Sequence, residues 1–67
     1  MVATFVSHIR PSGVFNESMR CRETGDIYVI VDTGSAFRIY VNGCYQAFRL
    51  SRSEALEYIE REAAMGL

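Results

Sequence analysis

Four short segments that end in glycine divide the chain at nearly even intervals. Each lies between runs of β-branched and aromatic residues, a pattern typical of antiparallel strands joined by tight hairpins. Such turns set the register between neighbouring strands, and the register decides which side chains share a face of the sheet. The segments are residues 11–13 (Pro-Ser-Gly), 23–25 (Glu-Thr-Gly), 32–34 (Asp-Thr-Gly) and 42–43 (Asn-Gly). Their spacing predicts a five-stranded antiparallel β-meander.

The chemistry of these turns also predicts the register of the sheet. Glycine at the left-handed position of a three-residue loop, or Asn-Gly in a type I′ turn, leaves the two flanking residues opposite each other. The expected pairs are Arg10 with Val14, Arg22 with Asp26, Val31 with Ser35, and Val41 with Cys44. This register gathers apolar side chains on one face, which is expected to form the core. The middle row of that face is Phe5, Met19, Val29, Phe37 and Phe48.

A helix is predicted after the last strand. Ser51 and Glu54 fit a capping box, which satisfies backbone N–H groups at a helix N-terminus, and Gly66 is a typical terminator. The apolar residues between them recur at helical spacing, at Ala55, Leu56, Ile59 and Ala63. The predicted fold class is therefore α+β: one small domain over residues 1–67, in which a C-terminal α-helix packs on one face of a five-stranded antiparallel β-meander.

One segment allows a second interpretation. Within residues 14–23, Phe15 and Met19 lie four positions apart, which fits a short helix. Met19 and Cys21 also alternate with arginine residues, which favours a strand. A strand is expected here, and a helix is the alternative.

A single helix covers only one face of a sheet, so the opposite face is expected to be open. In the predicted register this face combines arginine and tyrosine, which are enriched at protein interfaces because each offers a large contact area with a polar end. The alternatives are a ladder of cross-strand cation–π and aromatic pairs that only stabilises the sheet, and a homodimer interface. The candidate binding residues are Arg20, Tyr28, Arg38, Tyr40, Tyr45 and Arg49.

The composition argues against several classes of function. Hydrophobic residues make up 49% of the chain and charged residues 22%, as in a globular domain, and the net charge of −1 gives no strong overall attraction to nucleic acid. No apolar run is long enough to span a membrane, and the first residues do not resemble a signal peptide, so a cytoplasmic protein is expected. Two cysteines and one histidine cannot form an ordinary metal site, and no cofactor fingerprint is present.

Residues 30–36 (Ile-Val-Asp-Thr-Gly-Ser-Ala) resemble the active-site signature of the aspartic proteases. The resemblance implies a dimeric protease in which Asp32 and its copy in a second chain share a proton and activate water. The chain departs from that family after the signature, because residues 37–50 leave no room for both a flap hairpin and a second apolar segment. Residues 23–25 occupy an equivalent turn one hairpin earlier, which favours a turn at Asp32 as well. The chain is therefore not expected to be an enzyme.

Two other functions are compatible with the sequence. The expected one is a small non-enzymatic protein that binds a larger protein through the Arg/Tyr face, of the kind typical of phage and mobile-element inhibitors of host machinery. The alternative is nucleic-acid binding by the same face. The order of strands and helix is similar to that of the arm-binding domains of phage-type integrases, over residues 22–65 at most. Those domains are normally basic and this chain is not, which favours a protein partner.

Overall fold

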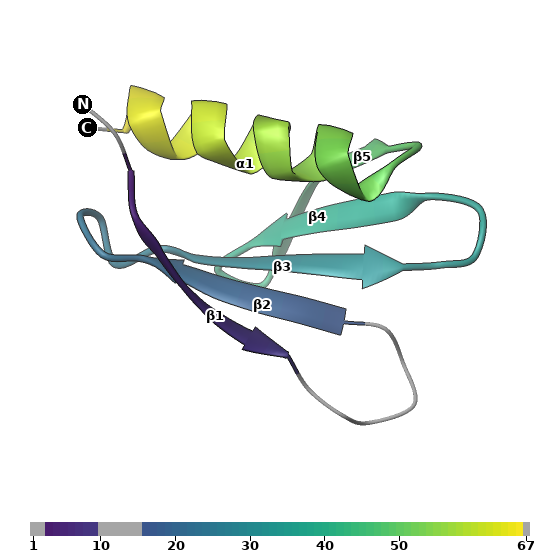
Figure 1. Ribbon diagram of the computed structural model, residues 1–67, viewed down its shortest axis with the longest axis horizontal. Helices are drawn as coiled ribbons and strands as arrows, with labels where there is room; N and C mark the ends of the chain where they lie inside the picture. The colour runs from purple at the N-terminus through teal and green to yellow at the C-terminus, as the bar shows by residue number, and fades with distance from the viewer. Residues whose placement is uncertain (1–2, 10–15, 67) are drawn as a thin grey trace.

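The computed structural model describes residues 3–9 and 16–66. Each strand pairs antiparallel with the next, in the order β1-β2-β3-β4-β5, and the helix lies across one face of the sheet (Figure 1). The predicted α+β meander is therefore confirmed, and residues 16–21 form a strand rather than a helix. The elements are β1 (Phe5–Ile9), β2 (Asn16–Cys21), β3 (Ile27–Asp32), β4 (Phe37–Val41), β5 (Cys44–Arg49) and α1 (Arg52–Met65).

Helix α1 begins and ends where the sequence predicts. The Ser51 hydroxyl accepts a hydrogen bond from the Glu54 backbone N–H at 3.2 Å, as expected of an N-cap residue. At the other end, the Gly66 N–H donates to the carbonyls of Glu62 and Ala63, each at 3.2 Å. These bonds satisfy backbone groups that would otherwise lack partners at the two helix ends.

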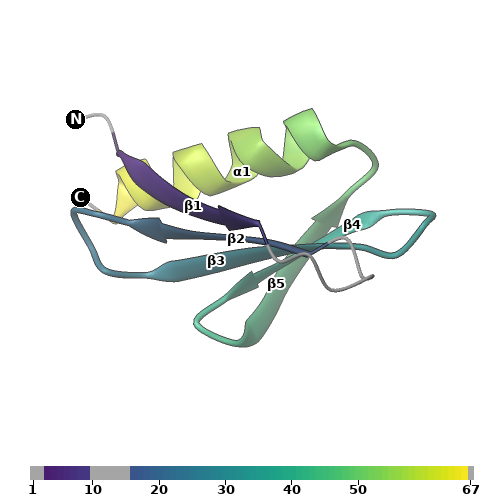
Figure 2. The ribbon, with the colours of Figure 1, turned by 60° about the horizontal axis from the view of Figure 1, so that its bottom comes forward.

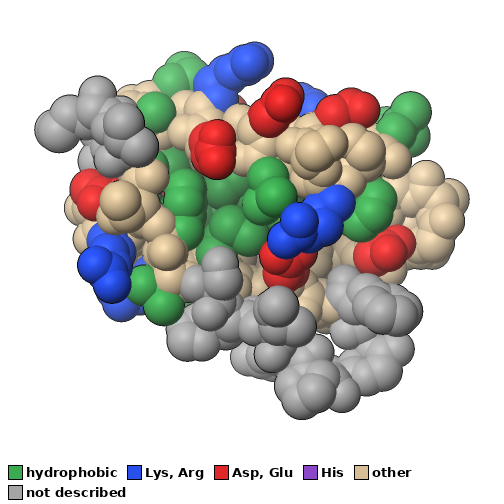
Figure 3. All heavy atoms as spheres, viewed as in Figure 1, with side chains coloured by type: hydrophobic (Ala, Val, Ile, Leu, Met, Phe, Trp, Pro, Cys, Tyr) green, Lys and Arg blue, Asp and Glu red, His purple; other side chains and the backbone are tan. Residues whose placement is uncertain are grey.

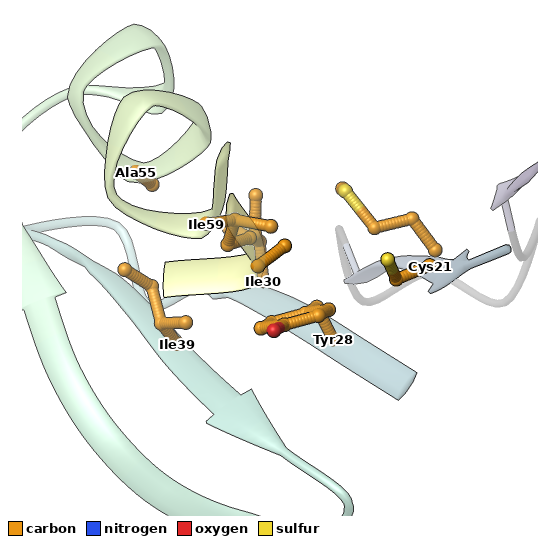
Figure 4. Close-up of a cluster of buried hydrophobic side chains, with 8 residues drawn as sticks. Cys21, Tyr28, Ile30, Ile39, Ala55 and Ile59 are labelled. Atoms are coloured by element: carbon orange, nitrogen blue, oxygen red, sulfur yellow. The ribbon is translucent and has the colours of Figure 1, made fainter. Parts of the chain in front are cut away.

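The core lies between α1 and the sheet. In Figure 4, Ala55 and Ile59 of the helix point toward Ile30 and Ile39 of the sheet, which fill the space below them. No charged side chain is buried within the described part of the chain. The buried side chains are Met19, Cys21, Tyr28, Ile30, Ile39, Ala55, Ile59 and Ala63.

The turn between β3 and β4 is set by two side chains. One carboxylate oxygen of Asp32 accepts a hydrogen bond from the Gly34 N–H at 2.8 Å, and the Thr33 hydroxyl accepts one from the Ala36 N–H at 3.1 Å. The Thr33 N–H also donates to the Ala36 carbonyl at 2.9 Å. Gly34 adopts a φ of 90°, which only glycine accepts readily. The turn is thus centred between Gly34 and Ser35, and the residue opposite Val31 moves by three positions from the predicted Ser35 to Arg38.

The β2–β3 loop is also longer than predicted. The Cys21 N–H donates to the Asp26 carbonyl at 2.9 Å, so four residues lie between this bonded pair, whereas three were predicted between Arg22 and Asp26. Met19 consequently pairs with Tyr28, and the predicted pair of Arg22 with Asp26 is wrong.

Together, these two turns place the side chains of β3 on the opposite faces of the sheet from those predicted. On its β4 side, Val31 pairs with Arg38 and not with Ser35 as predicted. A displacement by an odd number of residues sends every side chain of a strand to the other face. Ile30 therefore faces α1, whereas Val29, predicted to lie in the core, faces away from the helix.

The Asn-Gly turn between β4 and β5 is confirmed. Both turn residues have positive φ, 52° at Asn42 and 85° at Gly43, as a type I′ turn requires. The Asn42 side-chain oxygen also accepts a hydrogen bond from the Ile27 N–H at 2.9 Å, which ties this turn to β3. Val41 pairs with Cys44 as predicted.

Farther from that turn, β5 changes register. The pairs run from Tyr40 with Tyr45 directly to Ile39 with Ala47, so a bulge leaves one additional residue on β5. Phe48, predicted to lie in the core, therefore faces away from the helix. Bulges increase local twist, and in Figure 2 the β4–β5 hairpin turns away from the direction of β2 and β3.

Strand β1 is displaced by two residues from the predicted register. Phe5 pairs with Cys21 rather than with Met19, which leaves it on the helix side of the sheet as predicted. Its ring packs edge-on against the ring of Tyr28, with centroids 6.1 Å apart. The predicted pair of Arg10 with Val14 lies outside the described residues.

The start of β1 is held by one carboxylate. The Thr4 backbone N–H donates to one Glu23 carboxylate oxygen and the Thr4 hydroxyl to the other, both at 2.7 Å. These two bonds lower the pKa of Glu23 below its ordinary value of 4.5, because they stabilise the charged form.

The attachment of β1 is therefore expected to depend on pH. A lowered pKa in the folded state means that this stabilisation is fully present above about pH 4.5 and is lost as the pH falls through the folded pKa. In an NMR titration, the Thr4 amide resonance should move with the protonation of Glu23, and Glu23→Gln should abolish that movement. A Thr4 resonance that titrates unchanged in the Glu23→Gln variant would contradict the assignment.

Candidate interaction face

The face of the sheet opposite α1 is called the open face here. Its members include Val6 on β1, Arg20 on β2, Ile27, Val29 and Val31 on β3, Arg38 and Tyr40 on β4, and Tyr45 and Phe48 on β5. The register pairs Arg20 with Ile27 at one end and Arg38 with Phe48 at the other. An aliphatic strip along the central strand therefore has arginine on one side and arginine with aromatic rings on the other.

Large apolar side chains on this face are exposed to solvent. Ile27 is 46% exposed, and Tyr45 and Phe48 are each 53% exposed. Scattered apolar residues are normal on a protein surface, but a contiguous apolar patch is typical of an interaction site. An open groove of about 490 Å³ lies along β5 and reaches α1, and it is lined by residues 45–50 and Glu54.

Two tyrosines form a fixed aromatic corner on the open face. The rings of Tyr40 and Tyr45 pack edge to face, with centroids 5.7 Å apart and planes inclined at 70°. They are also directly opposite each other in the β4–β5 ladder. Tyrosine contributes a large contact area and loses little conformational entropy on binding, because it has few rotatable bonds.

Charge is divided between the two sides of the molecule. No carboxylate lies among the described strand side chains of the open face, while α1 carries Glu54, Glu57, Glu60 and Glu62 on the other side. Figure 3 shows acidic side chains along the outer surface of the helix. Over residues 3–9 and 16–66, the one ion pair joins Arg52 to Glu17, on the helix side, and it lowers the pKa of Glu17. Arg20 and Arg38 thus have no acidic partner within the described structure.

The structure brings together four of the six predicted binding residues, Arg20, Arg38, Tyr40 and Tyr45, on one face. It places the other two on the helix side. Tyr28 is only 3% exposed, because the reversed β3 turns it into the core, and burial raises the pKa of its hydroxyl. The prediction of an exposed Tyr28 is wrong.

Arg49 also lies on the helix side, because the β5 bulge reverses the end of that strand. Its guanidinium lies 4.8 Å from the centre of the Tyr58 ring of α1 and donates a hydrogen bond to the Phe48 carbonyl at 2.7 Å. The prediction that Arg49 shares the open face with Arg38 is wrong. Arg49 instead connects the last strand to the helix.

Sequence reasoning missed the apolar members of the open face, Ile27, Val29, Val31 and Phe48. Every residue from Ile27 to Val31 is apolar, so this segment has no alternation that would reveal which side is buried. The relevant signal was the Asp-Thr-Gly segment, since aspartate commonly accepts a hydrogen bond from the N–H two residues on.

The structure also places the other residues that the sequence analysis singled out. The carboxylate of Asp32 is engaged by the Gly34 N–H in the β3–β4 turn. Cys21 is buried and Cys44 exposed, and both are free thiols. No group of three or more possible metal ligands comes together in the described residues. Nor is any helix within them long and apolar enough to cross a membrane.

Comparison with known proteins found no relative. No family model matches the chain, and neither does any curated protein or solved structure.

The orientation of β3 can be tested with a matched pair of substitutions. Ile30→Thr places a hydroxyl in the core, where Ile30 is 2% exposed, and should destabilise the protein by about 1–3 kcal/mol. Val29→Thr makes a similar change on the open face and should cost less than about 0.5 kcal/mol. Urea unfolding followed by circular dichroism measures both. The opposite order of stabilities would restore the register predicted from the turns.

Proposed function

We propose that this chain is a non-enzymatic interaction protein that binds a larger protein through its open face. The observation that carries the proposal is that three large side chains, Ile27, Tyr45 and Phe48, are about half exposed on the sheet face opposite α1. The arginines at its margins add charge-assisted hydrogen bonding and selectivity. Apolar and aromatic anchors surrounded by arginine are the composition of interface hot spots.

The proposed activity is occlusion: the protein covers a surface of its partner and so blocks it, without chemistry of its own. An inhibitor of host machinery in a phage or mobile element would act in this way. The two free thiols fit a reducing compartment such as the cytoplasm.

Nucleic-acid binding by the same face is the second candidate, because arginine and aromatic residues lie side by side on it. The geometry supports it less well. Single-stranded bases stack on a series of exposed ring faces, whereas Tyr40 and Tyr45 pack against each other, Phe48 offers a single further ring, and the central strand offers only aliphatic side chains. The net charge of −1 also gives no general attraction to phosphate.

Affinity capture from a lysate of the source cells, with and without nuclease, separates the two candidates. The wild-type protein should retain a stoichiometric protein partner after nuclease treatment, and the double variant Arg38→Ala/Tyr40→Ala should lose it. Arg61→Ala, on the exposed surface of α1, is the matched control and should retain the partner.

Two results would count against the proposal. Recovery that depends on intact nucleic acid would favour the second candidate. Equal capture by the wild-type protein and the Arg38→Ala/Tyr40→Ala variant, both shown to be folded by circular dichroism, would remove the open face from the function.

A further inference from the structure

We infer that the partner segment recognised by the open face is an acidic amphipathic α-helix, which lies along β3 as a third layer on the sheet. This inference rests on the proposed function and specifies the partner of the same face. It follows from the charges on the face, from the distance between its arginines, and from the way in which α1 already packs on the other side.

The charges favour an acidic partner over a second copy of this chain. Arg20 and Arg38 lie on the open face, and the described strand residues there include no carboxylate. A third arginine, Arg22, lies in the turn one residue beyond β2 and is also exposed. Two open faces packed together would therefore bring arginine against arginine, and like charges across an interface are unfavourable. A partner that carries carboxylates around an apolar stripe has the complementary pattern.

The β5 edge of the sheet gives a second copy no better route. On β5, the Phe48 carbonyl already accepts a hydrogen bond from the Arg49 side chain at 2.7 Å. The Arg49 guanidinium is also held over the Tyr58 ring of α1. Strand addition along β5 would have to displace this side chain, because added strands bond to the same edge groups.

The spacing of the face fits a helix. Arg20 on β2 and Arg38 on β4 flank β3 on opposite sides. Strands lie about 4.8 Å apart, so these two backbone positions are separated across the sheet by roughly 10 Å. A helix with its side chains is about 10–12 Å in diameter. A helix centred on β3 would thus have one flank at each arginine.

The apolar positions also match along the length of the strand. Ile27, Val29 and Val31 recur every second residue, at intervals of about 7 Å along a strand. Helical residues four apart recur at about 6 Å. Helix α1 shows this packing on the other face of the same sheet, where its buried residues Ala55, Ile59 and Ala63 are each four apart.

The test uses three synthetic peptides of about 15 residues, which is roughly the length of α1. The first has leucine at every fourth position and glutamate on both flanks of that stripe. The second has the same composition in scrambled order, and the third has lysine in place of glutamate. Binding to the full-length protein is measured by fluorescence anisotropy and by backbone amide NMR, together with a single-stranded oligothymidine of about 15 nucleotides.

The acidic amphipathic peptide should bind at least about tenfold more tightly than the scrambled and the lysine peptides. Amide shifts should concentrate on β3 and its neighbours. Arg38→Glu should weaken that binding by at least about tenfold, whereas Arg61→Glu on α1, the matched charge reversal, should leave it unchanged. Both variants change exposed side chains, and circular dichroism verifies that they fold.

Several outcomes would overturn the inference. If the scrambled peptide bound as tightly as the acidic amphipathic peptide, the attraction would depend on charge alone. If the lysine peptide bound as tightly, the open face would not discriminate between acidic and basic partners. Amide shifts confined to the β5 edge would indicate strand addition. Tighter binding of the oligonucleotide than of the acidic peptide would indicate a nucleic-acid partner. Open-face shifts that grow with the concentration of the free protein would indicate that a second copy binds there.

These outcomes separate failure of the inference from failure of the proposed function. Suppose that nuclease-resistant capture is lost in Arg38→Ala/Tyr40→Ala but the protein shows no preference for the acidic peptide. The proposed function would then be supported and the helical partner rejected. Loss of both the capture and the peptide preference rejects both.

Discussion

The hydrogen bonds that Asp32 and Thr33 make within the β3–β4 turn determine which side of β3 faces the helix and which side faces solvent. Strand β3 occupies the centre of the sheet and is apolar on both sides, so hydrophobicity alone allows either side to face α1. The turn removes that freedom by fixing Thr33 opposite Ala36. Ile30 and Ile39 consequently meet the helix together, and the second apolar side of β3 remains outside.

That second side lies on the face opposite α1. The helix has 14 residues and covers the other face of the five-stranded sheet, and within the described residues the core between them contains eight buried side chains. Strand β3 nevertheless has the composition of a strand that is buried on both faces, which is usual when a sheet lies between two layers. The protein thus has two of the three layers that its central strand could accommodate. A partner that supplies the third layer would bury the remaining apolar side.

The sequence was sufficient for those parts of the fold that depend on local chemistry. The order of strands, the Asn-Gly turn and the Ser51 cap each rest on residues with one dominant role, and all three are confirmed. The apolar run of β3 gives no periodicity that would reveal its register, and the Asp-Thr-Gly segment, which does carry a signal, was assigned to the wrong loop residues. The β5 bulge had no local signal at all. These two features account for the misplacement of Tyr28 and Arg49 and for the missed aliphatic strip.

The contacts of Arg49 also affect whether further strands can add to the sheet at β5. Its side chain occupies the Phe48 carbonyl while its charge lies over Tyr58, so one residue closes part of an exposed strand edge that contains aromatic residues and no lysine or proline. Such an edge, if left bare, is a template for self-propagating β-sheet assembly. A charged side chain at position 49 therefore opposes the addition of a further strand along β5, so Arg49 is expected to reduce aggregation in addition to connecting the last strand to the helix.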